Sequence, residues 1–197
     1  MKKIKKENQD RWILLGFIGL TLLLYGVISA IFYRNVMWYS YFVMGGPLFF
    51  GYLNYKLKNE SIFKKDIREI FRLYLLYFVS GIIIELIGRH LLKFWYYPHY
   101  RPLDYIFQLL LIIYPIGFFF IYESFIFIKS NLKSFTITLI ITTLFQEFIN
   151  EFPNTFVYTW RYIIPYIKLE ILNINIVVVI GWVILIYIPL IIYKIIY

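Results

Sequence analysis

Residues 12–33 read WILLGFIGLTLLLYGVISAIFY, a run of 22 residues without a charged side chain. A helix that crosses a bilayer needs about 20 predominantly apolar residues, so this run is long enough to span a membrane. It follows the basic start MKKIKK, and no small-x-small cleavage site comes after it. Such a pattern is typical of an uncleaved signal anchor, and the rest of the chain is interpreted outward from it.

The overall composition agrees with a membrane protein. Hydrophobic residues make up 61% of the 197 residues, charged residues make up 16%, and the mean hydropathy is +0.72. Soluble domains have about 45–50% apolar and about 25% charged residues, so a soluble globular enzyme and a disordered chain are both excluded. The chain has no cysteine, which excludes disulfide frameworks, cysteine metal sites and thiol nucleophiles.

Five further segments are apolar enough to continue this pattern. The sequence therefore predicts an all-α polytopic membrane bundle of about six transmembrane helices, in a single domain over residues 1–197. The predicted spans are 12–33, 36–53, 70–92, 105–128, 135–150 and 176–193. The second is expected to be broken by Gly45-Gly46-Pro47, and the short fifth one is either a span or a re-entrant segment.

The distribution of lysine and arginine predicts the orientation. With six spans, fourteen of the 20 basic residues fall in the N-terminus, the 2–3 and 4–5 loops and the C-terminus. The other six are Arg34, Arg89, Lys93, Arg101, Arg161 and Lys168. The positive-inside rule then places both termini in the cytoplasm of a cell-membrane protein. The net charge of +9 is assigned to this topology and to lipid headgroups, not to nucleic acid.

A weak internal repeat accompanies these spans. A Trp/Tyr cluster follows each odd helix, and each even helix carries one proline. The clusters are Trp38-Tyr39-Ser40-Tyr41, Trp95-Tyr96-Tyr97-Pro98 and Trp160-Arg161-Tyr162, and the prolines are Pro47, Pro115 and Pro189. Three helical hairpins in tandem would fit this pattern. Ordinary interfacial belts of Trp and Tyr would fit it equally well. The second and third units are the most alike, with Glu85-Leu86-Ile87 and Glu147-Phe148-Ile149 before their clusters.

Glu85 is the first intramembrane acid, and such acids are functional candidates because they are costly to bury. At helical spacing it shares a face with Gly81 and Gly88, so we expect it to point into the bundle. Arg89 lies four residues further on the same face. The structural interpretation is an internal Glu85–Arg89 salt bridge, and the functional one is a catalytic acid tuned by Arg89.

A second polar group begins at Glu147. Asn150, Glu151 and Asn154 follow it at spacings that share one helix face if the helix continues to residue 152, after which Pro153 is expected to end it. Two carboxylates one turn apart repel unless a cation intervenes, and the candidates for that cation are Arg89, Arg161 and His90. The alternative is that Glu151 is solvated in the outer loop and Glu147 is the sole buried acid.

The remaining polar residues have plainer interpretations. Glu123 lies near the inner end of the fourth span and is interpreted as an interfacial or helix-packing acid. Asp104 is interpreted as the N-cap of the same span. The candidate catalytic residues are thus Glu85, Glu147 and Arg89. The candidate binding residues are Glu151, Asn150, Asn154, Trp95, His99, Trp160 and Arg161. His90 and His99 are the only histidines, and neither lies in a metal-ligand spacing, so no metal site or cofactor is predicted.

One partial family resemblance exists. Over about a fifth of the chain, the order Glu85-Leu86-Ile87-Gly88, Trp95-Tyr96-Tyr97 and Pro115 resembles the small polytopic lycopene-cyclase and carotenoid-hydratase membrane proteins. The resemblance implies acidic residues within helices that protonate a polyene. The paired acid that those families carry after the later proline is absent, because this chain reads Tyr114-Pro115-Ile116-Gly117.

Three functions fit these observations. The preferred hypothesis is a non-enzymatic membrane protein that acts through partners or as a scaffold, its acids only holding helices together. The second is a lipid- or isoprenoid-binding membrane enzyme with Glu85 and Glu147 as acid and base. The third is a small transporter, favoured by the proline-containing helices. The expected partners are membrane lipids, including anionic headgroups at the basic cytoplasmic loops, with a second copy of the chain as a further candidate.

Overall fold

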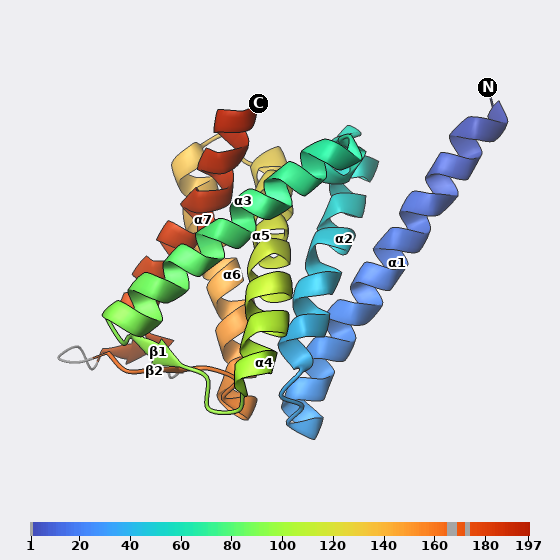
Figure 1. Cartoon of the computed structure of the whole chain (residues 1–197). Helices are drawn as coiled ribbons and strands as arrows, with labels where there is room; N and C mark the ends of the chain where they lie inside the picture. Colours follow the sequence, from blue (N-terminus) through green and yellow to red (C-terminus); the bar gives the residue numbers. More distant parts are fainter. Residues whose placement is uncertain (1, 165–168, 172–173) are drawn as a thin grey trace.

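The computed structural model describes residues 2–164, 169–171 and 174–197, and it is an all-α bundle of six helical rods with two short β-ribbons (Figure 1). The helices are α1 (Lys2–Tyr33), α2 (Trp38–Lys58), α3 (Ile67–Glu85), α4 (Pro102–Asp104), α5 (Tyr114–Asn131), α6 (Phe135–Val157) and α7 (Ile176–Ile196). A 3-10 turn, η1, covers Ile62–Lys64, and two π-helical segments, η2 (Leu86–Leu91) and η3 (Tyr105–Ile113), extend α3 and join α4 to α5. The strands are β1 (Trp95–Tyr96), β2 (Arg161–Tyr162), β3 (Glu170–Ile171) and β4 (Ile174–Asn175).

Four helical stretches in the described part of the chain are long and apolar enough to cross a membrane. They are Gln9–Tyr33, Ile67–Leu91, Pro102–Asn131 and Ile176–Ile196. The helices α2, with 21 residues, and α6, with 23 residues, are not among these stretches. At 1.5 Å per residue both are nevertheless about 30 Å long or slightly more, close to the thickness of the hydrocarbon core. The membrane-protein class is thus supported, and six complete spans stay a prediction.

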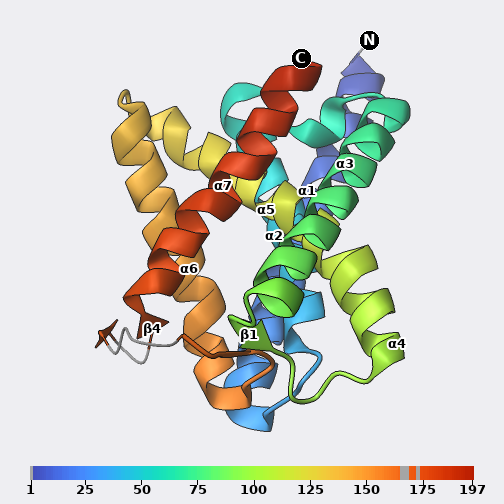
Figure 2. The ribbon, with the colours of Figure 1, turned by 60° about the vertical axis from the view of Figure 1, so that its left-hand side comes forward.

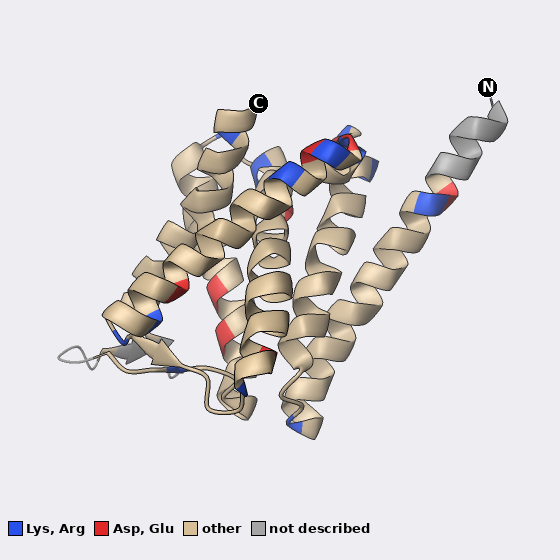
Figure 3. Cartoon of the chain, viewed as in Figure 1, with Lys and Arg blue, Asp and Glu red and all other residues tan. Residues whose placement is uncertain are grey.

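The two ends of the bundle differ in character. The N-terminus, the α2–α3 connection, the α5–α6 connection and the C-terminus gather at one end, here called the basic end (Figures 1 and 3). The turn at residues 34–37 and the β1–β2 ribbon lie at the other end, here called the ribbon end (Figure 1). The chain therefore crosses the bundle an even number of times, as predicted. Which end faces the cytoplasm stays a prediction.

Two expected helix breaks are wrong. The helix α2 continues through Pro47, and α6 continues through Pro153 to Val157, where Tyr158 adopts a left-handed conformation and caps it. Proline is tolerated within membrane helices because neighbouring groups satisfy the freed backbone. The glycines beside Pro47 serve packing instead. A Cβ on Gly45 would lie 2.5 Å from the Gly19 carbonyl oxygen of α1, so the two helix backbones are in direct contact.

The helix α5 forms the centre of the bundle. Figure 2 shows it surrounded by α2, α3, α6 and α7, and eight consecutive residues, 118–125, are buried along it. One apolar cluster packs α3 and α7 against α5 around Tyr77, Phe118 and Trp182. A second cluster packs α1, α2 and α6 against α5 around Trp38, Phe120 and Trp160. The helices on both sides of α5 are therefore positioned by one shared core element.

The α1–α2 contact gives a prediction. A Gly45→Ala substitution forces α1 and α2 apart, because the atoms it meets belong to the rigid backbone of α1. We expect it to lower the free energy of unfolding by about 1–3 kcal/mol, measured by denaturant titration in detergent micelles. Gly181→Ala in α7 is the matched control, since a Cβ there meets nothing within 4 Å. Equal effects of the two substitutions would contradict this packing.

Candidate functional site

The candidate site begins with the carboxylate of Glu85, which is only 2% exposed at the end of α3. One oxygen, Oε1, accepts hydrogen bonds from the Trp95 indole at 3.1 Å and from the hydroxyls of Tyr97 and Tyr114, both at 2.6 Å. The other, Oε2, accepts from the Tyr105 hydroxyl at 2.9 Å. Four neutral donors from three different segments thus converge on one acid.

The local chain geometry brings Trp95 to Glu85. After α3 the helix widens into η2, and Lys93 turns the chain with a positive φ of 56° before β1 begins. The Trp95 ring then lies directly against Gly88, where a Cβ would come within 1.7 Å of Cη2. Gly88 is therefore required for the Trp95 indole to fold back onto Glu85.

The π-helix η3 explains why two tyrosines of one helix reach the same acid. Tyr105 and Tyr114 are nine residues apart, which is about 2.5 turns of an α-helix and would place them on opposite faces. The i→i+5 bonds of a π-helix make each turn wider, so nine residues come close to two whole turns. Both hydroxyls consequently point at Glu85.

Arg89 does not form the predicted salt bridge with Glu85, so that prediction is wrong. The one ion pair among the described residues joins Arg101 to Asp104. The Arg89 guanidinium instead lies over the Tyr105 ring, 4.2 Å from its centroid, and 5.6 Å from that of Tyr97. Burial, and then the adjacent Tyr114 and Glu85, raise the pKa of Tyr97 well above its ordinary value, so its hydroxyl stays protonated and donates. Hydrogen bonds from Trp and Tyr side chains therefore stabilise the Glu85 carboxylate where an ion pair with Arg89 had been predicted.

A second carboxylate, Glu151 of α6, has the same kind of environment. It is 4% exposed, so the expectation of a solvated Glu151 is wrong. Its Oε2 accepts from the Trp160 indole at 3.1 Å, and its Oε1 accepts from the Tyr162 hydroxyl at 2.7 Å and the Trp182 indole at 3.3 Å. Desolvation and the neighbouring carboxylate raise the pKa of Tyr162, which keeps this hydroxyl a donor.

The β1–β2 ribbon links the two carboxylates. Trp95 pairs with Tyr162 and Tyr96 pairs with Arg161 in antiparallel register. Each strand thus supplies donors to its own acid while pairing with the other strand. The indole and phenol donors follow Glu85 by 10 and 12 residues and follow Glu151 by 9 and 11. The counterpart of Glu85 in the third unit is therefore Glu151, whereas the sequence pattern had pointed to Glu147.

The predicted polar face of α6 is confirmed as a shared and buried face. Glu147, Asn150, Glu151 and Asn154 are all between 1% and 6% exposed. Asn154 binds the backbone of Trp160 through both its amide atoms, and the Asn150 amide nitrogen donates to the carbonyl and side chain of Gln146. Glu147 differs from them, because its Oε1 is buried and has no hydrogen-bond partner among the described residues. Neither Arg89, Arg161 nor His90 neutralises it.

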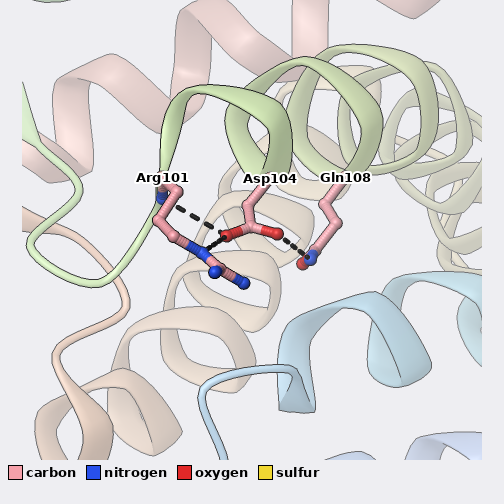
Figure 4. Close-up of polar contacts among 3 residues, drawn as sticks. All are labelled: Arg101, Asp104 and Gln108. Carbon is pink, nitrogen blue, oxygen red and sulfur yellow. Dashed lines mark hydrogen bonds and ion pairs between the residues drawn. The ribbon is translucent and has the colours of Figure 1, made fainter.

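The other predicted site residues lie outside these networks. Arg161 lies over the Tyr158 ring, 4.2 Å from its centroid, and His99 is exposed in the segment between β1 and α4. Asp104 is not the N-cap of its helix. Figure 4 shows that it is the third residue of α4, where it accepts from the Arg101 backbone and side chain and from Gln108. The helix begins one turn earlier than expected because Pro102 fits its first position.

A separate polar cluster at the basic end contains Glu123. It is fully buried, and it accepts from Asn54, the Ser61 hydroxyl and the Ile62 backbone, as expected of a packing acid. Beside it lies a pocket of about 240 Å³. Its polar lining comes from Asn59, Glu60, Ser61, Lys64, Lys65 and Glu123.

The sequence interpretation missed most of the hydrogen-bond donors. Tyr97, Tyr105, Tyr114, Tyr162 and Trp182 were not singled out, because twenty tyrosines and five tryptophans in one chain give little contrast. The regular spacing from each acid to its following Trp and Tyr was the available signal. No group of three or more His, Asp or Glu side chains suited to a metal ion occurs among the described residues.

The chain was compared with known protein families, characterised proteins and solved structures, and none of them matches it. The partial resemblance to the lycopene-cyclase and carotenoid-hydratase membrane proteins stays a resemblance.

The position of Arg89 gives a second prediction. Replacing a partner of a buried ion pair costs about 3–5 kcal/mol, whereas losing a cation–π contact costs about 0.5–2 kcal/mol. Since Arg89 contacts Tyr105 and not Glu85, Arg89→Met should show the smaller loss of unfolding free energy in micelles. A loss of about 3–5 kcal/mol would contradict this arrangement and support a Glu85–Arg89 ion pair.

Proposed function

We propose that the chain is a non-enzymatic integral membrane protein in which Glu85 and Glu151 are structural acids. The observation that carries this proposal is the occupancy of the two carboxylates. Every oxygen of both accepts at least one hydrogen bond from a Trp or Tyr side chain. The acids thereby hold the β1–β2 ribbon against the end of the bundle.

The energetics favour this structural role. A hydrogen bond to a charged group contributes about 1.5–3 kcal/mol, and a buried donor left unpaired costs about 1–3 kcal/mol. Removing Glu85 would leave up to four donors without their acceptor, and removing Glu151 would leave three. Either loss is large beside a typical folding free energy of about 5–15 kcal/mol.

The enzyme hypothesis has less support. A general acid or base must reach a proton of its substrate, but both Glu85 oxygens already bind protein donors. No described hydrogen bond joins Glu147 to Glu85 or Arg89, so the proposed acid–base pair has no direct connection among the described residues.

A cross-link tests the structural role directly. The chain has no native cysteine, and residues 96 and 161 are directly paired at a separation that suits a disulfide. We expect Tyr96→Cys with Arg161→Cys to cross-link efficiently under mild oxidation. Adding Glu85→Gln or Glu151→Gln should lower the yield several-fold and lower the melting temperature.

Asp10→Asn is the matched control, because Asp10 is exposed in the N-terminal part of α1 and lies outside the pocket lining. It should change neither the cross-link yield nor the melting temperature. Unchanged cross-linking in both the Glu85→Gln and Glu151→Gln backgrounds would refute the structural role.

For the lipid partner, we propose that the pocket beside Glu123 binds an anionic headgroup. The Lys64 ammonium donates to the backbone carbonyl of Asn59 at 2.7 Å and to the Asn59 side-chain oxygen at 3.0 Å. The Lys65 ammonium lies 3.6 Å from the Tyr197 ring centroid. Within the described part of the chain, the Lys64 ammonium uses two of its three donors and the Lys65 ammonium only faces rings. Basic side chains at a membrane surface attract anionic lipid.

The headgroup proposal is testable with lipid-bound protein. In native mass spectrometry, Lys64→Gln with Lys65→Gln should retain several-fold less phosphatidylglycerol than the wild-type chain, while phosphatidylcholine retention stays the same. Lys129→Gln, an exposed lysine of α5 outside the pocket lining, should retain phosphatidylglycerol normally. Equal losses in both variants would assign the effect to general surface charge.

A further inference from the structure

The polar face of α6 has more hydrogen-bond acceptors than the protein satisfies. Three oxygen atoms on it are buried and have no partner among the described residues: Thr143 Oγ1, Glu147 Oε1 and Asn150 Oδ1. Their residues are spaced by four and three positions, so Thr143 and Asn150 lie about one turn to either side of Glu147 on one face. All three residues are at least 95% buried.

Apart from the Thr143 hydroxyl, the neighbouring polar side chains already use donors of this face. The Asn150 amide nitrogen donates to Gln146, the Gln146 amide nitrogen donates to the Ser124 hydroxyl, and the Thr142 hydroxyl donates to the Thr138 carbonyl. The Glu147 carboxylate and the Asn150 carbonyl oxygen can only accept. One free hydroxyl thus faces two groups that only accept, so this face is short of donors or of positive charge among the described residues.

Among the described residues no basic side chain forms an ion pair with Glu147 or Glu151, and Arg34, which contacts α6, lies over Phe156. The sequence of α6 contains no Lys, Arg or His, and α5 and α7 carry only Lys129 and Lys194, both near the basic end. Glu151, one turn beyond Glu147, adds a second acid that binds only neutral donors. Figure 3 shows the acidic positions of α6 in the half nearer the ribbon end, away from the basic positions of α5 and α7.

We propose that this face binds one monovalent alkali cation, with Glu147 as its charged ligand and with Thr143 and Asn150 as neutral oxygen ligands. Carboxylate, amide and hydroxyl oxygens are the ligands that hard cations prefer. A single charge matches the one carboxylate whose buried oxygen has no partner. Each carboxylate oxygen of Glu85 and Glu151 accepts a hydrogen bond from a Trp or Tyr side chain, whereas Glu147 Oε1 accepts none from the described residues. The proposed cation site is therefore distinct from the two structural acids.

Equilibrium binding of ²²Na⁺ to the purified full chain in nanodiscs tests the proposal. We expect saturable binding of about one ion per chain, and a melting temperature that rises by several degrees in sodium chloride relative to choline chloride at equal ionic strength. Glu147→Gln should abolish both effects, and potassium competition will rank the two ions. Asp10→Asn, the same carboxylate-to-amide change at an exposed position of α1 outside the pocket lining, should leave both unchanged.

A matched pair of substitutions separates ligation from packing. Thr143→Val keeps the shape and removes the oxygen, so it should weaken ²²Na⁺ binding at least several-fold, whereas Thr143→Ser should bind nearly as the wild-type chain does. Absence of saturable ²²Na⁺ binding to the wild-type chain would overturn the proposal and leave water or a proton at Glu147. Undiminished binding to a folded Glu147→Gln variant would overturn it as well. Neither result bears on the cross-linking test of Glu85 and Glu151.

Discussion

The hydrogen bonding of a buried carboxylate by aromatic side chains is the interaction on which the ribbon end of this bundle depends. In the apolar core of a bilayer no water is available to solvate a polar group, so an acid placed there must collect its donors from the protein. Glu85 collects four, and Glu151 collects three. Each acid thereby fixes the relative positions of its own helix, a strand and the following helix.

Tryptophan and tyrosine suit this task for a physical reason. Each has a large apolar ring and one polar atom at its edge, so the ring packs in the core while the N–H or O–H reaches the acid. Trp95 shows both parts, because its ring covers Gly88 and its indole nitrogen binds Glu85. A lysine or arginine in the same place would bring a second charge that also needs desolvation. Trp and Tyr, which commonly form a belt at the membrane interface, here also donate hydrogen bonds to buried carboxylates.

Hydropathy and helical spacing predicted a large part of this arrangement. Hydropathy alone predicts the helices α1 and α7, which have long apolar runs. The helical spacing of Glu147, Asn150, Glu151 and Asn154 correctly placed these residues on one face. The prediction of a Glu85–Arg89 pair failed because spacing shows which side chains are able to meet, and not which donors other segments offer. The π-helical turn that rotates Tyr105 toward Glu85 has no recognised sequence signal. The expected end of α6 at Pro153 was wrong because proline is tolerated within membrane helices, and α6 continues to Val157.

Because the chain is synthesised from its N-terminus, the hydrogen-bond donors of Glu85 and of Glu151 become available at different times. All donors of Glu85 lie between Trp95 and Tyr114, so they are available soon after α3 itself leaves the ribosome. The donor set of Glu151 is complete only after Trp182 of α7, 31 residues further along the chain, has been synthesised. The middle of the protein can therefore enter the bilayer with its acid already satisfied. The α6–α7 hairpin, in contrast, leaves the donor set of Glu151 incomplete until α7 packs against α6.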